Sequence, residues 1–91
     1  LGTLSLHRKN YEEMLQYSLR SKQIFEDLDR NNDVFRVNIN VAVAYEYLNQ
    51  DEKAKKTYLE TIQLIPVYEI KDASDLYHNF AGFYKIIMVR N

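Results

Sequence analysis

The residues best suited to chemistry in this chain are few and scattered. Its two histidines, His7 and His78, stand far apart in the sequence, and Asp75 is the acidic residue nearest to His78. Asp75 and His78 are three residues apart, so a helix would place both on one face as two metal ligands. Two ligands do not make a zinc site, which takes at least three from the protein. The sequence contains no cysteine, which excludes disulfides and thiolate metal sites.

A second candidate is the segment DLDRNNDVF, residues 27–35, which has the Asp-x-Asp-x-Asn spacing of a calcium-binding loop. The position that needs glycine carries Asn32, and the closing glutamate position carries Asn38. We therefore interpret the segment as a polar connection that caps a helix. The sequence also shows no Ser-His-Asp spacing, phosphate-binding loop or His-Glu-x-x-His motif. We predict that the chain is not an enzyme and uses no metal ion or cofactor.

A third candidate is a pattern, Asn-x-Ala-x-x-Tyr, that occurs twice. It begins at Asn40 in NVAVAY and again at Asn79 in NFAGFY. An asparagine side chain offers a donor and an acceptor, so it can bind the backbone of an extended peptide. Asparagine is unfavourable inside a helix, and it also bonds readily to neighbouring backbone or fills a polar seam. The pattern alone leaves both interpretations open.

Long helices are the elements that must position these residues. The sequence has only two glycines and one proline among 91 residues, which indicates few breaks. Apolar residues spaced by three and four predict helices over 10–28, 33–48, 51–65 and 72–90, after a part-helix over 1–8. The expected breaks lie near residues 9, 30, 50 and 69. Pro66 is expected to end the third of the full helices, because the residue before a proline avoids the helical region.

Residues 33–48 contain many β-branched side chains and could be taken for a strand. The segment is about twice as long as a buried strand of about 4–8 residues, so we predict a buried helix. Asn10, followed by Glu13, has the form of a capping box for the helix over 10–28. The other expected caps are Asn32 or Asp33, and Asp72 or Ser74.

The two copies of the pattern belong to a longer internal repeat. An offset of 39 aligns Ala42 with Ala81 and Tyr45 with Tyr84, and an offset of 40 aligns Gly2 with Ala42. The same offset of 40 aligns Met14 with Ala54, Ser18 with Tyr58, Ser21 with Thr61 and Ile24 with Leu64. A small residue recurring in this way allows two helices to cross closely.

The repeat resembles the tetratricopeptide repeat family, whose unit is a pair of helices of about 34 residues. The middle of the chain carries its motif, with Val41-Ala42-x2-Tyr45 at the Leu-Gly-x2-Tyr element and Ala54-x3-Tyr58 at the Ala-x3-Phe element. Pro66 closes this unit at the expected place. The tryptophan position carries Asn38, and the period of 39 to 40 is longer than that of the family.

The resemblance implies an all-α fold of antiparallel helix hairpins stacked into a superhelix, with about five helices. The units are expected at about 1–28, 33–66 and 72–91, within a single domain over 1–91. Because the first residue is Leu1 rather than Met, we interpret the chain as a piece of a longer or processed protein.

In this family the first helices of the units line a concave groove that binds peptides. The resemblance places Ile39, Glu46, Asp75, Gly82 and Lys85 in this groove. It also places there Arg36, Asn40, Val43, Tyr47, His78 and Asn79. The charges among these residues are mixed, so they do not define the sign of a ligand.

The segment FAGFYKIIMV, residues 80–89, is apolar around almost the whole helix. A terminal helix of a repeat array should have a polar outer face. We therefore expect either a cut from a longer array or a homodimer that covers the segment. The expected interface residues are Phe80, Phe83, Ile86 and Ile87.

These features favour a non-catalytic module that binds a peptide or protein segment. Its long units and Asn-rich loops resemble the sensory half of bacterial transcriptional regulators that respond to peptides. The alternative is a structural segment whose repeats pair subunits. The net charge of −1 argues against direct contact with nucleic acid. No apolar run reaches membrane-spanning length, and we expect a cytoplasmic protein.

Overall fold

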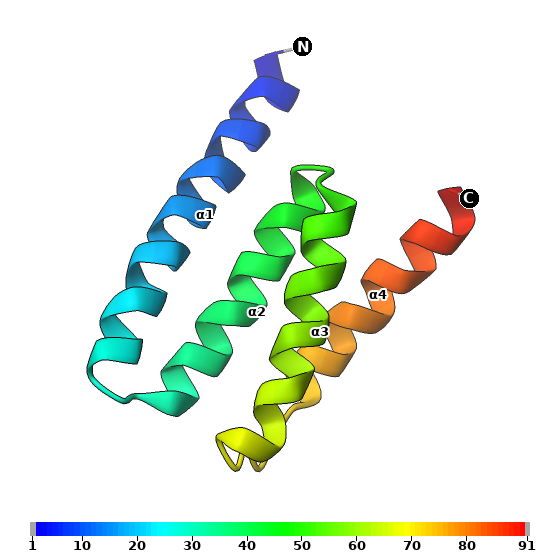
Figure 1. Ribbon diagram of the computed structural model, residues 1–91. Coiled ribbons are helices and arrows are strands. Elements are labelled where there is room, and N and C mark those ends of the chain that lie inside the picture. Colours follow the sequence, from blue (N-terminus) through cyan, green and yellow to red (C-terminus); the bar gives the residue numbers. More distant parts are fainter. Residues whose placement is uncertain (1, 91) are drawn as a thin grey trace.

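Four α-helices follow one another along the chain and are joined by short connections (Figure 1). A computed structural model describes the backbone of residues 2–90 and the side chains of residues 7–90. The helices are α1 (Gly2–Asp27), α2 (Asn31–Tyr47), α3 (Asp51–Val67) and α4 (Ser74–Arg90). The described residues contain no strand, so the prediction of an all-α chain is confirmed, including the choice of a helix over 33–48. The prediction of about five helices is wrong.

The missing break lies in α1, which runs without interruption through residue 9. His7, Arg8 and Lys9 offer neither glycine nor proline to interrupt the backbone hydrogen bonds. The guanidinium of Arg8 also donates to the carboxylate of Glu12 across the expected break, at 3.3 Å. Asn10 consequently lies within α1 and does not cap it. Gly2 begins this same helix and does not belong to a separate one.

The starts of α2 and α4 show how local polar groups begin a helix. Arg30 occupies the N-cap position of α2 without a side-chain hydrogen bond, and its guanidinium pairs with Asp33 at 2.7 Å. The prediction of Asn32 or Asp33 as the cap is therefore wrong, and Asp33 instead places negative charge in the first turn. At α4, the carboxylate of Asp72 accepts hydrogen bonds from the backbone N–H and the hydroxyl of Ser74. α4 thus begins at Ser74, one of the two predicted residues, whereas Asp72 lies before the helix and bonds to its first residue.

The three connections between the helices begin with the same turn. Asp29, Asn49 and Glu69 have left-handed backbone conformations, with φ of 54°, 60° and 53°, and they recur at equal intervals along the sequence. Each lies two residues after its helix, and the next residue donates its N–H back to a carbonyl five residues earlier. This pair of features defines a Schellman motif, which satisfies the last carbonyls of a helix. The prediction that Pro66 ends the third full helix is wrong, because Pro66 lies inside α3, which continues to Val67 before this turn closes it.

Neighbouring helices run antiparallel, with α1 and α4 at the two edges of the molecule (Figure 1). Within the described residues, α1 contacts only α2, whereas α4 contacts both α2 and α3. α2 is therefore the central element. It is packed against α1 on one side and against α3 and α4 on the other.

The core lies where α2, α3 and α4 meet. Tyr58 of α3 is fully buried, and its ring lies 5.2 Å from that of Phe80 and 5.3 Å from that of Phe83. Ala42 of α2 and Ala54 of α3 belong to the same core cluster, and both are fully buried. Small side chains at these positions allow α2 and α3 to approach closely.

Candidate functional site

The outward face of α2 carries a row of polar side chains. Asn32, Arg36 and Asn40 are spaced by four residues, so they lie on one side of the helix, and all three are exposed. Their sequence neighbours Phe35 and Ile39 are 4% and 6% exposed and pack into the core. α2 thus presents amide and guanidinium groups above an apolar layer.

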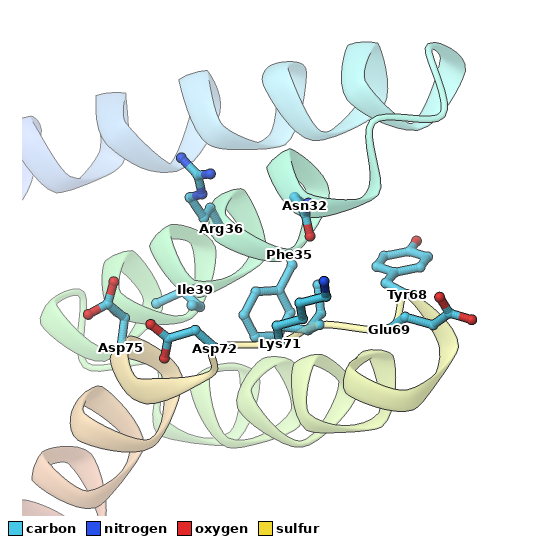
Figure 2. A pocket seen from close by; sticks show the side chains of 10 residues that line it. Asn32, Phe35, Arg36, Ile39, Tyr68, Glu69, Lys71, Asp72 and Asp75 are labelled. Carbon is cyan, nitrogen blue, oxygen red and sulfur yellow. The ribbon is translucent and has the colours of Figure 1, made fainter.

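A pocket of about 520 Å³ opens beside the first turns of α2. It is formed between α2, the connection from α3 to α4, and the start of α4. Figure 2 shows the side chains of α2 on one side of it and those of the connection on the other. The residues that line it are Asn32, Phe35, Arg36, Ile39, Tyr68, Glu69, Ile70, Lys71, Asp72 and Asp75.

The rim of this pocket carries charges of both signs. Arg36 and Lys71 are cationic, whereas Glu69, Asp72 and Asp75 are acidic. The ion pairs among the described residues are Arg8–Glu12, Arg30–Asp33 and Arg90–Asp51, and none of them involves a residue of this rim. The charged groups of the rim thus form no direct ion pair among the described residues.

Asp72 differs from the other acids of the rim because its carboxylate is already engaged. The hydrogen bonds from the hydroxyl and backbone N–H of Ser74 lower its pKa from the usual 3.8. It therefore remains ionised while it caps α4. Asp75, one turn further along α4, is the exposed acid that faces the pocket from the helix itself.

Part of the groove expected from the sequence comes together at this pocket. Arg36 and Ile39 of α2 line it together with Asp75 of α4. Asn40 is exposed one turn further along α2, beyond the pocket lining. Val43 is half-buried and packs against the core cluster.

Tyr47 lies elsewhere, at the junction of α2 with α1. Its ring stacks on that of Tyr11, with centroids 4.7 Å apart and planes 12° from parallel. Tyr47 thus joins two helices, although its own side chain remains 55% exposed.

The two asparagines of the repeated pattern have different surroundings. The amide of Asn79 donates to the backbone carbonyl of Asp75, one turn earlier in α4, at 2.8 Å. Its donor therefore bonds within its own helix, as one of the two interpretations anticipated. Asn40, by contrast, extends into an exposed position on α2. His78 is also exposed, on α4.

The pocket also contains residues that sequence reasoning did not select. Tyr68, Glu69 and Lys71 come from the connection between α3 and α4. This connection spans residues 68–73, whereas the other two span three residues each. Its extra length was the signal available in the sequence, because longer loops between regular elements often carry binding residues.

The apolar residues of α4 are distributed differently from the expected interface. Phe83 is 1% exposed and belongs to the core, and Phe80 and Ile87 are half-buried against it. Ile86 is 42% exposed. Phe83 therefore does not lie on the surface of the folded chain, because α4 turns this side towards Tyr58 of α3.

Asn38, which the resemblance aligns with a tryptophan, is buried between the helices. It is 3% exposed, and its Oδ1 has no hydrogen-bond partner among the described residues. Buried polar atoms are normally paired, so this oxygen is an exception in the packing of α2.

The part of the chain that the structure describes holds no metal centre, since no three side chains of the metal-binding types lie together there. None of the four described helices is long and apolar enough to cross a membrane. Comparison with protein-family models, curated proteins and solved structures finds no match for this chain.

Proposed function

We propose that this chain is a non-catalytic helical-repeat module that binds an extended peptide or protein segment over α2 and α4. The observation that carries the proposal is the pocket shared by α2, α4 and the connection between α3 and α4. A site built from three separate segments exists only in the folded chain. Its shape is therefore set by the packing of the helices.

The chemistry of the pocket suits a peptide. Phe35 and Ile39 supply an apolar floor for a side chain, and Arg36, Lys71 and Asp75 offer charges of both signs around it. The exposed amide of Asn40, one turn away, offers a donor and an acceptor for a peptide backbone. Binding sites for ligands commonly combine an apolar base with a few polar groups in this way.

The proposal extends to the kind of repeat. We propose that α2 and α3 form one tetratricopeptide-like unit and that α4 is the first helix of the next. The burial of Ala42 against the α3 cluster and the recurrence of the same turn after α1, α2 and α3 support this assignment. The resemblance to peptide-responsive bacterial regulators makes the sensing of a peptide signal the specific role that we propose.

The experiment that tests the proposal is selection of binders from a random peptide library. The immobilised chain is panned against the library, and enriched peptides are then titrated by fluorescence anisotropy. Arg36→Glu should weaken the enriched peptides by about tenfold or more, which corresponds to about 1.4 kcal/mol. Lys55→Glu is the matched control, because Lys55 is an exposed cation of α3 outside the pocket lining. The proposal fails if no peptide is enriched or if both variants bind equally.

A second candidate function is a structural one, in which the repeats pair subunits. The exposed aromatic residues of α4, with Tyr77 52% and Tyr84 41% exposed, favour it. Replacing both Asn40 and Asn79 by Ala separates the two functions. Loss of peptide binding with unchanged assembly supports the peptide-binding module, whereas altered assembly supports the structural segment.

A further inference from the structure

One face of α4 is open and largely apolar. Tyr77, Ala81, Tyr84 and Met88 are spaced by four, three and four residues, so they form one stripe along the helix. All four are exposed, and Met88 reaches 71%. We call these four residues the α4 stripe. It lies beside the side of α4 that packs on Tyr58, and the two meet where the Tyr84 ring contacts the edge of Phe80, with centroids 5.1 Å apart.

The α4 stripe has a covered counterpart inside the same chain. The repeat offset of 39 relates Ala81 and Tyr84 to Ala42 and Tyr45 of α2. Ala42 is fully buried in the cluster that includes Ala54 of α3. The ammonium of Lys53, also on α3, lies 5.8 Å from the centre of the Tyr45 ring. The α2 positions that correspond to Ala81 and Tyr84 of the α4 stripe therefore lie against α3.

α1 and the turn that follows it have an open face of the complementary kind. Tyr17, Ile24 and Leu28 are 74%, 56% and 61% exposed, at a spacing of seven and four residues. We call these three residues the α1 stripe. The repeat offset of 40 relates them to positions 57, 64 and 68, the first two on α3 and the third just after it. Thr57 is buried and Leu64 packs against the core cluster. The corresponding side chains of the α1 stripe have no covering helix among the described residues.

We propose that these two open faces bind each other between copies of the chain. The α4 stripe of one copy packs against the α1 stripe of the next, antiparallel, as α2 packs against α3. The occupant of each face is thus a second copy of this chain. The contact between α2 and α3 is the template for this pairing. The α4 stripe corresponds to positions on α2, and the α1 stripe corresponds to positions on and just after α3.

The charges beside the stripes agree with this pairing. In the internal contact, α2 carries Glu46 and α3 carries Lys53. The offset of 39 relates Glu46 to Lys85 of α4, and the offset of 40 relates Lys53 to Glu13 of α1. Lys85 and Glu13 are both exposed and carry opposite charges, so the two open faces have complementary charges at these positions.

Pairing two different faces gives a heterologous, head-to-tail contact. A copy that binds a neighbour through its α4 stripe still has a free α1 stripe. Association therefore continues unless the rotation between successive copies closes the assembly into a ring. Phe35, Arg36 and Asp75 belong to neither stripe, so this inference does not depend on the proposed peptide site. A chain can therefore associate whether or not the pocket binds a peptide.

Sedimentation velocity over a range of concentrations tests the association. We expect the wild-type sedimentation coefficient to rise with concentration. Ala81→Arg and Ile24→Glu should each abolish the rise, and neither should prevent folding, because both positions are exposed. Val89→Glu on α4 and Leu19→Glu on α1 are the controls, since both side chains are exposed outside the stripes. These two controls should associate like the wild type.

Mixing the two stripe variants tests the head-to-tail arrangement itself. An Ala81→Arg chain keeps an intact α1 stripe, and an Ile24→Glu chain keeps an intact α4 stripe. Each variant alone should stay a monomer, whereas an equimolar mixture should form a dimer and nothing larger. A mixture that stays monomeric overturns the proposal, as does a wild type that stays monomeric at every concentration. Circular dichroism melts identify a variant that fails to fold, and Tyr84→Arg or Tyr17→Glu then replaces it.

Discussion

The hydroxyl of Tyr58 donates a hydrogen bond to the carboxylate of Glu46, at 2.9 Å, and so joins α3 to the last turn of α2. The Tyr58 ring is fully buried against two rings of α4, so the bond lies beside the core where three helices meet. Burial raises the pKa of Glu46 and raises that of Tyr58 further above its usual range. One polar contact thus holds an ionisable carboxyl in half-buried surroundings.

Replacing Tyr58 by Phe removes the hydroxyl and keeps the ring contacts. Glu46 then loses its donor while it stays half-buried, so we expect the free energy of unfolding to fall by about 1–2 kcal/mol. Tyr17→Phe is the control, because Tyr17 is 74% exposed, and it should change stability by less than about 0.5 kcal/mol. Urea denaturation measures both. Equal effects of the two substitutions would show that the hydrogen bond does not stabilise the fold.

Glu46 also predicts a dependence of stability on pH. Its folded-state pKa is raised above the ordinary 4.5 mainly by burial, and the bond from Tyr58 offsets part of the rise. The folded chain therefore holds this proton to a higher pH than the unfolded chain does. The retained proton on Glu46 therefore adds to the free energy of unfolding at low pH. This contribution is fully present below about pH 4.5 and is lost as pH rises through the folded-state pKa.

The variant Glu46→Gln keeps an acceptor for Tyr58 and cannot ionise. We expect the unfolding free energy of this variant, relative to that of the wild type, to increase as pH rises from about 4 to about 7. Urea denaturation at several pH values gives the comparison. A difference between the two proteins that stays constant over this range would contradict the raised pKa.

The two alanines of the repeated pattern form a matched pair for a packing test. Ala42 is fully buried between helices, whereas Ala81 is exposed on α4. Ala42→Leu should cost about 1–3 kcal/mol by overpacking, and Ala81→Leu should be within about 0.5 kcal/mol of the wild type. Thermal melting at low protein concentration records both values. An unchanged melting temperature for Ala42→Leu would show that Ala42 does not lie at a close contact between helices.

The left-handed turn after α3 is built on a residue that does not favour it. Glu69 has a φ of 53°, a conformation that glycine adopts at lower cost. Glu69→Gly should therefore raise the free energy of unfolding by about 0.5–1 kcal/mol. The control, Glu60→Gly, lies at an exposed position inside α3 and should lower it by about 1 kcal/mol. Chemical denaturation compares the two. If both substitutions lower the free energy of unfolding, the left-handed backbone of Glu69 does not cost stability.

The helix over 33–48 could be predicted from its length, although its β-branched residues also fit a strand. In the structure Val34, Asn38, Val41 and Leu48 are buried on one side of α2, at a spacing typical of a helix. The uninterrupted course of α1 through residue 9 was not predicted from the sequence. The expected break near residue 9 came from the capping-box form of Asn10 and Glu13, whereas the backbone there follows its own helix-forming residues.

The candidate site was harder to predict, because it depends on contacts between distant segments. Arg36 and Asp75 were grouped by the repeat, and both line the pocket. Lys71 and Tyr68 were missed because no periodic pattern covers the connection that brings them there. The same limit applies to α4, where a helix that is apolar on most sides does not indicate that Phe83 is the residue turned inward.

The position of α1 at the edge has a consequence for how the chain opens. Because α1 contacts only α2 within the described residues, it can detach while the rings around Tyr58 stay packed. α4 cannot leave without uncovering Leu76 and Phe83, which are almost fully buried. Detaching α1 uncovers a different set of buried residues on α2, among them Val34, Val41 and Leu48, which lie outside the cluster around Tyr58. The two edge helices should therefore open in separate steps, each with its own opening free energy. Amide hydrogen exchange would record these steps, and a molecule that covers α1 would slow exchange in that helix.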